Sequence, residues 1–334
     1  MMSKTKEKRI VVIGGGTGTF VVLSGLKKYP VRLSAIVSMA DSGGSNRVLR
    51  DEMGLLPTSD IRQCLVALAA NNNGAETLLR KLFTYRFCRG KGIDGMTFGN
   101  LFMAALSDIL QSQEKAILQT QNILKIKGEI LPVTLTNTQL AAVYENGLKV
   151  IGEHHIDEPR HDIKLRIKKA FLVPQAKAYK PALEAIKKAN LIVIGPGDLY
   201  TSLISNLLVK GVPEAIRRSK AKKVFIMNLM TRPGQTYGFS AKDHILAIEQ
   251  YLGENVLDFA IVNSTPVPLA IVRKYQAEKA CPVVDNLGNI MKPKIIRKDL
   301  LSNKVTLRIL GDSLWRSLIR HDSAKLAKAI FNLL

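Results

Sequence analysis

The stretch Ile10-Val11-Val12-Ile13-Gly14-Gly15-Gly16-Thr17-Gly18-Thr19 decides the fold class. Four β-branched residues run directly into a glycine-rich turn, and a helical pattern follows to about residue 28. This order is typical of the first strand, turn and helix of a parallel sheet that is covered on both faces. The same rhythm predicts further strands at 31–38, 191–194, 223–227 and 259–262 and helices at 201–209 and 241–251. We therefore predict an α/β fold, with a three-layer Rossmann-like core on a doubly wound parallel sheet.

Two segments interrupt this rhythm. Helical periodicity dominates an inserted block at about 60–125. Short strand-like runs follow at about 128–171, with the turn signal Asn146-Gly147 between them, and predict a small antiparallel β appendage. These runs lie at 130–134, 141–144, 149–151 and 163–170. No linker rich in Gly, Ser or Pro separates the α/β stretches, so we expect a single domain over 1–334.

Composition excludes several classes of protein. With 334 residues, 46% of them hydrophobic and 23% charged, the chain is long and apolar enough for a globular core. No run approaches the roughly 20 apolar residues of a membrane helix, and the N-terminal apolar run is too short for a signal peptide. We expect a cytoplasmic protein with no membrane partner. Cys64, Cys88 and Cys281 are odd in number and widely spaced, which favours buried free thiols.

The formal net charge of +22 would attract nucleic acid or phosphorylated ligands. The basic residues gather at the ends of predicted helices, for example Lys187, Lys188, Arg217 and Arg218, where cations suit the helix dipole. No aromatic residues interleave with them to stack on bases. We expect a solvated basic face and no specific nucleic-acid partner.

Two glycine-rich turns follow predicted strands and indicate a ligand cleft. In the first, backbone amides of Gly14, Gly15, Gly16, Thr17 and Gly18 suit a phosphate, although Thr19 stands where a dinucleotide fingerprint has its third glycine. In the second, Gly195 and Gly197 permit close approach, and Thr201 and Ser202 offer hydroxyls. Either turn alone could serve only tight packing. Together they favour an elongated phosphorylated ligand.

Other polar residues follow strands or open helices. Asp41 would accept a ribose hydroxyl, bind magnesium or bond its own turn, whereas Asp60 reads as a helix N-cap. Asn100 could be a helix N-cap or a hydrogen-bond partner for a base or sugar. The guanidinium of Arg232 suits two hydrogen bonds to a phosphate or carboxylate. The five histidines show no metal-ligand spacing, and no catalytic residue is readable.

Several motifs together resemble one family. They are IGGGTG, ADSGGS, LLPTSDIRQCLVAL, TFGNL, IGPGDLYTSLISNLL, NLMTRPGQTYGFSAKDHI and the late RHD. The chain resembles the gluconeogenesis-factor family, also called YvcK, a branch of the CofD-like superfamily. The resemblance implies a Rossmann-like cytoplasmic protein needed for gluconeogenic growth and normal cell shape, which binds UDP-glucose or UDP-N-acetylglucosamine. The related 2-phospho-L-lactate transferase branch moves a phospholactyl group from a nucleotide carrier to a deazaflavin and uses magnesium.

The resemblance also implies site residues. Residues 14–18, Asp41, Asn100, Gly195 and Gly197 match cleft motifs of the superfamily. Tyr275 and Arg320 match nucleotide-sugar positions of this branch, where an aromatic face suits uracil and a guanidinium suits diphosphate. We further expect a homodimer and an unidentified protein partner in envelope synthesis.

The chain departs from the family pattern at three places. Ser42 replaces an aspartate, Thr58-Ser59 replaces Pro-Gly, and Met96 replaces a histidine. The loss of one carboxylate makes a magnesium ion doubtful. These departures favour a non-catalytic UDP-sugar-binding regulator over a CofD-like transferase, while an NAD-like dinucleotide remains an alternative ligand. Ser323, next to RHD, is a candidate phosphorylation site in a segment expected to be exposed.

Overall fold

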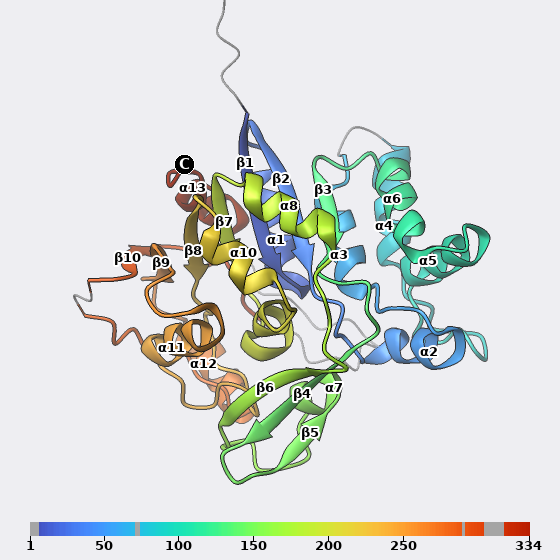
Figure 1. Ribbon diagram of the computed structural model, residues 1–334. Coiled ribbons are helices and arrows are strands. Elements are labelled where there is room, and N and C mark those ends of the chain that lie inside the picture. Colours follow the sequence, from blue (N-terminus) through green and yellow to red (C-terminus); the bar gives the residue numbers. More distant parts are fainter. Residues whose placement is uncertain (1–6, 71–73, 289–290, 304–316) are drawn as a thin grey trace, which may run out of the picture.

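The computed structural model describes residues 7–70, 74–288, 291–303 and 317–334 (Figure 1). Its main sheet has seven strands in the order β10-β9-β8-β7-β1-β2-β3, and every pairing is parallel. The strands are β1 Lys8–Gly14, β2 Val31–Val37, β3 Glu129–Pro132, β7 Leu191–Ile194, β8 Lys222–Ile226, β9 Phe259–Asn263 and β10 Lys294–Lys298. The predicted doubly wound parallel sheet is confirmed.

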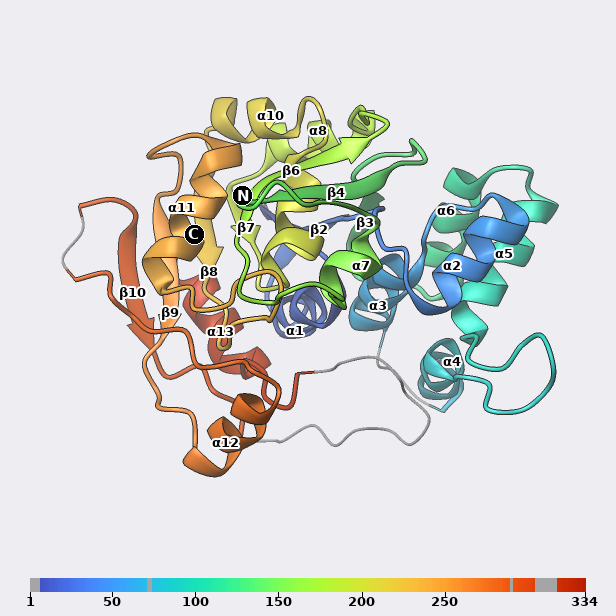
Figure 2. The same ribbon diagram turned by 90° about the horizontal axis from the view of Figure 1, so that it is seen from below.

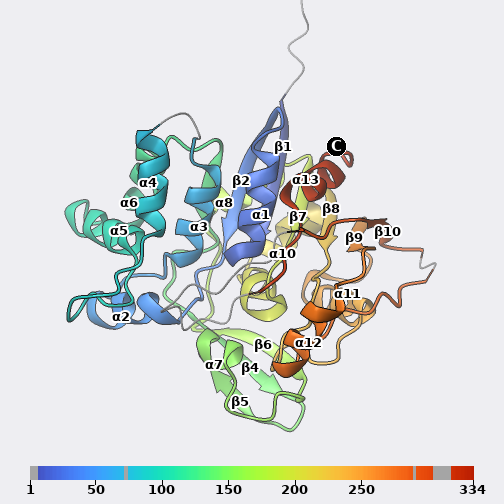
Figure 3. The same ribbon diagram turned by 180° about the vertical axis from the view of Figure 1, so that it is seen from behind.

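Helices cover both faces of this sheet and make the three layers. Helices α1 Gly16–Leu26, α3 Ser59–Leu68 and α13 Ser323–Phe331 pack together on one face (Figure 3). The opposite face carries α8 Lys180–Lys188, α10 Val212–Arg218 and α11 Ala241–Leu252 (Figure 1). Covered on both sides, the run 10–13 of β1 is at most 1% exposed, which explains its continuous apolar pattern.

The inserted helical block is confirmed. Its first helix, α3, packs on the face of the sheet, and α4 Ala75–Thr84, α5 Phe98–Ile109 and α6 Gln113–Ile123 stand beside the sheet (Figure 1). The preceding α2 Gly44–Met53 was not predicted, because its sequence is mostly polar. Three further helical elements are η1 Leu199–Ile204, α9 Ser205–Leu207 and α12 Leu269–Ala277; η1 and α9 form the helix expected at 201–209.

The β appendage is smaller than predicted. Its antiparallel sheet has the order β5-β4-β6, with β4 Gln139–Tyr144, β5 Lys149–Ile151 and β6 Ile167–Val173. The run expected at 130–134 is instead β3, which pairs in parallel with β2 at the edge of the main sheet. That part of the prediction is wrong, because a four-residue apolar run fits either sheet and does not reveal its partner.

The order of the strands creates a crevice between β1 and β7. From β1 the chain builds the sheet toward β2 and β3, and later from β7 toward β8, β9 and β10. The loops that leave β1 and β7 therefore diverge, which is where open α/β sheets bind ligands. The small sheet and α7 Glu153–Asp157 lie below this carboxyl edge (Figures 1 and 2).

Three smaller expectations are settled by the same structure. Cys64, Cys88 and Cys281 are free thiols, but only Cys64 is buried, and Cys88 is exposed. In the described part of the chain, no helix is both long and apolar enough to cross a membrane. Ser323 is not an exposed tail residue, because it is partly buried in the first turn of α13.

Candidate functional site

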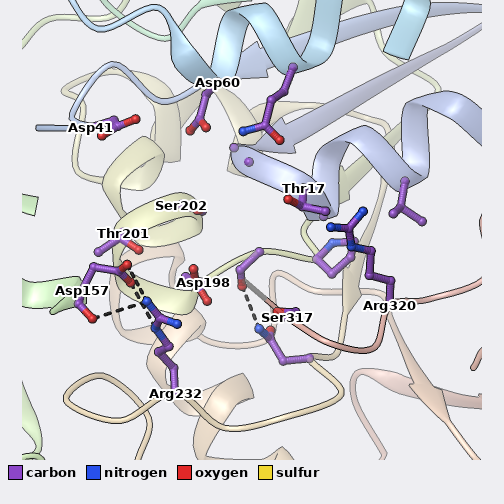
Figure 4. A pocket seen from close by; sticks show the side chains of 18 of the residues that line it. Thr17, Asp41, Asp60, Asp157, Asp198, Thr201, Ser202, Arg232, Ser317 and Arg320 are labelled. Atoms are coloured by element: carbon purple, nitrogen blue, oxygen red, sulfur yellow. Dashed lines mark hydrogen bonds and ion pairs between the residues drawn. The ribbon is translucent and has the colours of Figure 1, made fainter. Parts of the chain in front are cut away.

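A pocket opens where the loops after β1 and β7 diverge (Figure 4). Its cavity of about 270 Å³ is lined by both glycine turns, the turn after β2, α7 and the segment around Arg320. The structure therefore brings together most of the residues predicted from the sequence. The lining includes Gly15, Gly16, Thr17, Gly18, Asp41, Gly197, Thr201, Tyr275 and Arg320.

The first glycine turn forms the N-terminus of α1. Gly16 has φ +61°, a left-handed conformation that glycine adopts without strain. Gly18 lies so close to the Pro196 carbonyl group of the second turn that a Cβ atom would collide with it. Gly16, Thr17 and Gly18 are nevertheless partly exposed to the pocket. One loop therefore combines the tight packing and the backbone exposure that we expected.

The second glycine turn is fixed by neighbouring side chains. Gly195, with φ +81°, and Gly197 are packed against Leu203, and Asn228 donates from Nδ2 to the Gly197 carbonyl oxygen at 2.8 Å. Thr201 is buried at the pocket wall. Gly195 itself does not line the pocket, so it shapes the turn while Gly197 faces the cavity.

Asp41 bonds its own turn and also reaches the pocket. Its Oδ1 accepts from the Gly43 amide at 2.9 Å, and its Oδ2 accepts from Asn46 Nδ2 at 2.6 Å. Burial raises the pKa of Asp41 despite these two donors. Both readings of this residue, a turn former and a cleft residue, are therefore compatible with its position.

The expectation that Asp60 caps α3 is wrong. The cap position is Thr58, and no side chain caps this helix end. Asp60 instead lies against the first glycine turn, where its carboxylate contacts Gly15 and faces Gly16. Burial and the charges of Asp41 and Asp198 raise the pKa of Asp60 to about 7.

Helix α7 and the residue that follows it supply acidic side chains that the sequence did not reveal. Glu153, Asp157 and Glu158 line the pocket, together with His154. Glu153 Oε2 accepts from the Ser42 amide at 3.3 Å, and Ser42 Oγ accepts from the His154 amide at 3.0 Å. Ser42 therefore holds α7 at the site through two hydrogen bonds, and α7 brings the Glu153 carboxylate with it.

A buried ion pair joins α7 to the loop after β8. Arg232, 6% exposed, donates from Nε to Asp157 Oδ1 at 3.1 Å and from Nη2 to Oδ2 at 2.5 Å (Figure 4). Gln235 Nε2 adds a bond to Asp157 Oδ1 at 2.9 Å. The Arg232 guanidinium thus binds a carboxylate of its own chain through two hydrogen bonds. Burial raises the pKa of Asp198 to about 6, although the Arg232 charge opposes this shift.

Asn100 does not reach the pocket. It is fully buried, and its amide bonds Arg62 Nε at 3.1 Å, Ser59 Oγ at 3.1 Å and Asn46 Oδ1 at 3.4 Å. Since Asn46 in turn bonds Asp41, Asn100 links α5 to the turn that holds Asp41. Asn100 therefore supports the site from behind, and a contact with a base or sugar stays a prediction.

Tyr275 supports the segment that carries Arg320. Its side chain is fully buried, and its hydroxyl oxygen accepts from the amides of Leu318 at 2.8 Å and Ile319 at 3.3 Å. The structure therefore does not offer the open aromatic face that we expected for uracil. Arg320 does line the pocket, beside Thr17 (Figure 4). The adjacent His321 is buried, which lowers its pKa to about 4 and keeps the imidazole neutral.

The acidic residues do not form a metal centre. Across 7–70, 74–288, 291–303 and 317–334, no group of three or more histidine, cysteine, aspartate or glutamate side chains is placed to hold a metal ion.

Comparisons with known proteins agree with the motifs. The family model described as 2-phospho-L-lactate transferase CofD matches residues 10–301. The chain is 39% identical over 326 residues to a gluconeogenesis factor of Halalkalibacterium halodurans, covering 97% of this chain and 96% of the relative. It is 38% identical over 332 residues to the gluconeogenesis factor of Bacillus subtilis, covering 98% and 99%.

A solved structure shares the fold. It is the crystal structure of a member of the upf0052 family from Bacillus halodurans, with a TM-score of 0.88 and 37% sequence identity. The match covers 98% of this chain and 99% of that one. The architecture described above is therefore that of an experimentally known relative.

Proposed function

The chain belongs to the 2-phospho-L-lactate transferase CofD family, and from this premise we propose that it is a gluconeogenesis factor that binds UDP-sugars in the cytoplasm. In this proposal, UDP-glucose or UDP-N-acetylglucosamine occupies the pocket between β1 and β7. The UDP-sugar-bound protein acts on a partner in envelope synthesis. Carbon supply thereby affects cell shape. The protein acts as a homodimer.

One observation carries the proposal. The N-terminus of an 11-residue helix, α1, and the cation Arg320 face the same cavity at a topological switch point. Free amides at a helix N-terminus and a guanidinium both favour a diphosphate. The carboxylates on the α7 side supply acceptors for sugar hydroxyl groups.

Calorimetric titration tests the proposal. UDP-glucose, UDP-N-acetylglucosamine and NAD would be titrated into wild-type protein, Arg320→Ala and the control Arg218→Ala. Arg218 is exposed at the end of α10, away from the pocket lining. We expect saturable UDP-sugar binding that Arg320→Ala weakens at least tenfold and Arg218→Ala leaves unchanged. Binding of NAD alone would favour the dinucleotide alternative, and equal affinity in all three proteins would contradict the assigned site.

A CofD-like transferase is the second candidate, favoured by the carboxylate cluster. Asp60, with a pKa of about 7, and Asp198, with a pKa of about 6, titrate where general acids and bases operate. Mass spectrometry of nucleotide-linked phosphoesters incubated with the protein and an acceptor would detect transfer. Product that disappears in Asp60→Asn would support this candidate, whereas no product in wild-type protein would count against it.

A further inference from the structure

Asp60 occupies the place where the first glycine turn would receive a phosphate oxygen. Its carboxylate contacts Gly15 and faces Gly16. The backbone amides at the start of α1 favour an anion. A carboxylate of the same chain therefore already lies beside this anion-binding turn.

The surroundings of Asp60 are mostly acidic. Asp41 faces it from the turn after β2, Asp198 from the loop after β7 and Glu153 from α7. Arg62, on the next residues of α3, is the cation that opposes them. A diphosphate would add two negative charges to this group. An ionised Asp60 and a bound diphosphate would thus repel each other at the first glycine turn.

The neighbouring acids are less suited to remove this repulsion by taking up a proton. Asp41 is held as a carboxylate acceptor by Gly43 and Asn46. Asp198 is partly neutralised by Arg232. Burial and the charge of Asp41 raise the pKa of Glu153 well above its usual range. Asp60 is the acid that lies directly against the first glycine turn, so it is the group that we expect to change its protonation.

We propose that Asp60 takes up one proton when the diphosphate binds, so that the site accepts the nucleotide only together with the neutral carboxyl form of this residue. This inference rests on the function proposed above. The proton comes from solvent. Once protonated, the carboxyl group of Asp60 has no charge to repel the diphosphate, and its hydroxyl group donates to a phosphate oxygen. Asp60 thereby makes affinity for diphosphate esters depend on pH.

The size of the effect follows from the pKa of Asp60. A pKa of about 7 leaves roughly three-quarters of the free protein ionised at pH 7.5, so binding should take up about 0.75 proton. Between pH 6 and pH 8, affinity should fall about tenfold. UDP-glucose is a suitable probe because its diphosphate has no ionisation in this range.

Calorimetry in two buffers of different ionisation heat, Hepes and Tris, measures the proton uptake. Wild-type protein, Asp60→Asn and the control Asp108→Asn would be titrated with UDP-glucose at pH 6, 7.5 and 8. Asp108 is exposed on α5 and does not line the pocket. We expect uptake in wild type and Asp108→Asn, and loss of both uptake and pH dependence in Asp60→Asn.

Three outcomes would overturn the inference. Wild-type binding without buffer-dependent heat, or proton uptake that persists in Asp60→Asn, excludes Asp60 as the proton acceptor. If Asp60→Asn does not fold, Asp198→Asn replaces it, because loss of this neighbouring charge should lower the pH at which affinity begins to fall. An unchanged midpoint would contradict the inference. No binding of UDP-glucose at any pH would instead overturn the proposed function itself.

Discussion

The Arg232 and Asp157 pair is the contact on which we expect the folded site to depend most. Replacing Arg232 by alanine leaves the Asp157 and Asp198 carboxylates without their shared cation in a poorly solvated place. Breaking a buried pair by removing one partner costs about 3–5 kcal/mol. The Asp157 side chain is 23% exposed and keeps its bond to Gln235, so we expect the lower end, about 3 kcal/mol.

The chain contains a matched control for this variant. Arg297 also makes two bonds to one carboxylate, from Nε to Asp285 Oδ2 at 2.6 Å and from Nη2 to Oδ1 at 3.1 Å, but its side chain is 41% exposed. Exposed pairs contribute about 0–1 kcal/mol. Urea unfolding at pH 7.5 would compare Arg232→Ala and Arg297→Ala with wild type. Equal losses below about 1 kcal/mol would refute the claim that burial makes the Arg232 pair important.

Three further predictions concern the pocket. Asp60→Asn should stabilise the protein by about 1–2 kcal/mol at pH 8 and by less near pH 4, as measured by urea unfolding at both pH values. The reason is that an acid with a raised pKa destabilises the fold increasingly as pH rises to about 7. His321 has a lowered pKa of about 4, so as pH falls below about 6.5 the unfolded chain takes up the proton before the folded protein does. Between pH 7 and pH 5, the free energy of unfolding of wild type should therefore fall by about 2 kcal/mol more than that of His321→Asn, as measured by urea unfolding. Gly18→Ala should cost about 2 kcal/mol in thermal unfolding because its Cβ collides with the Pro196 backbone, whereas Gly43→Ala, which meets only ordinary contacts, should cost less than about 1 kcal/mol.

Local patterns predicted the elements that depend on neighbouring residues in the chain. The β-branched run before Gly14 and the similar run 191–194 before Gly195 are buried parallel strands. Each strand is followed by a turn that needs glycine, because Gly16 and Gly195 have positive φ values and Gly18 touches another backbone. These constraints act within a few residues, so they are visible in the sequence.

The features that the sequence did not reveal concern side chains whose partners are distant in the chain. Asp60 precedes a helix, and the same local pattern fits a cap for its own helix or, as found, a contact with the N-terminus of α1. Tyr275 looks identical in sequence whether its ring is open or packed beneath Leu318. The acids of α7 meet Asp41 only because the β appendage folds back on the carboxyl edge of the sheet. Tertiary packing decides all three.

A crystal structure of the protein with UDP-glucose would test the central claim most directly. We predict the diphosphate within hydrogen-bond distance of the amides of Gly16, Thr17 and Gly18 and of the Arg320 guanidinium, with the sugar toward α7. A diphosphate bound elsewhere, while the cavity between β1 and β7 stays free of nucleotide at saturating concentration, would contradict the account.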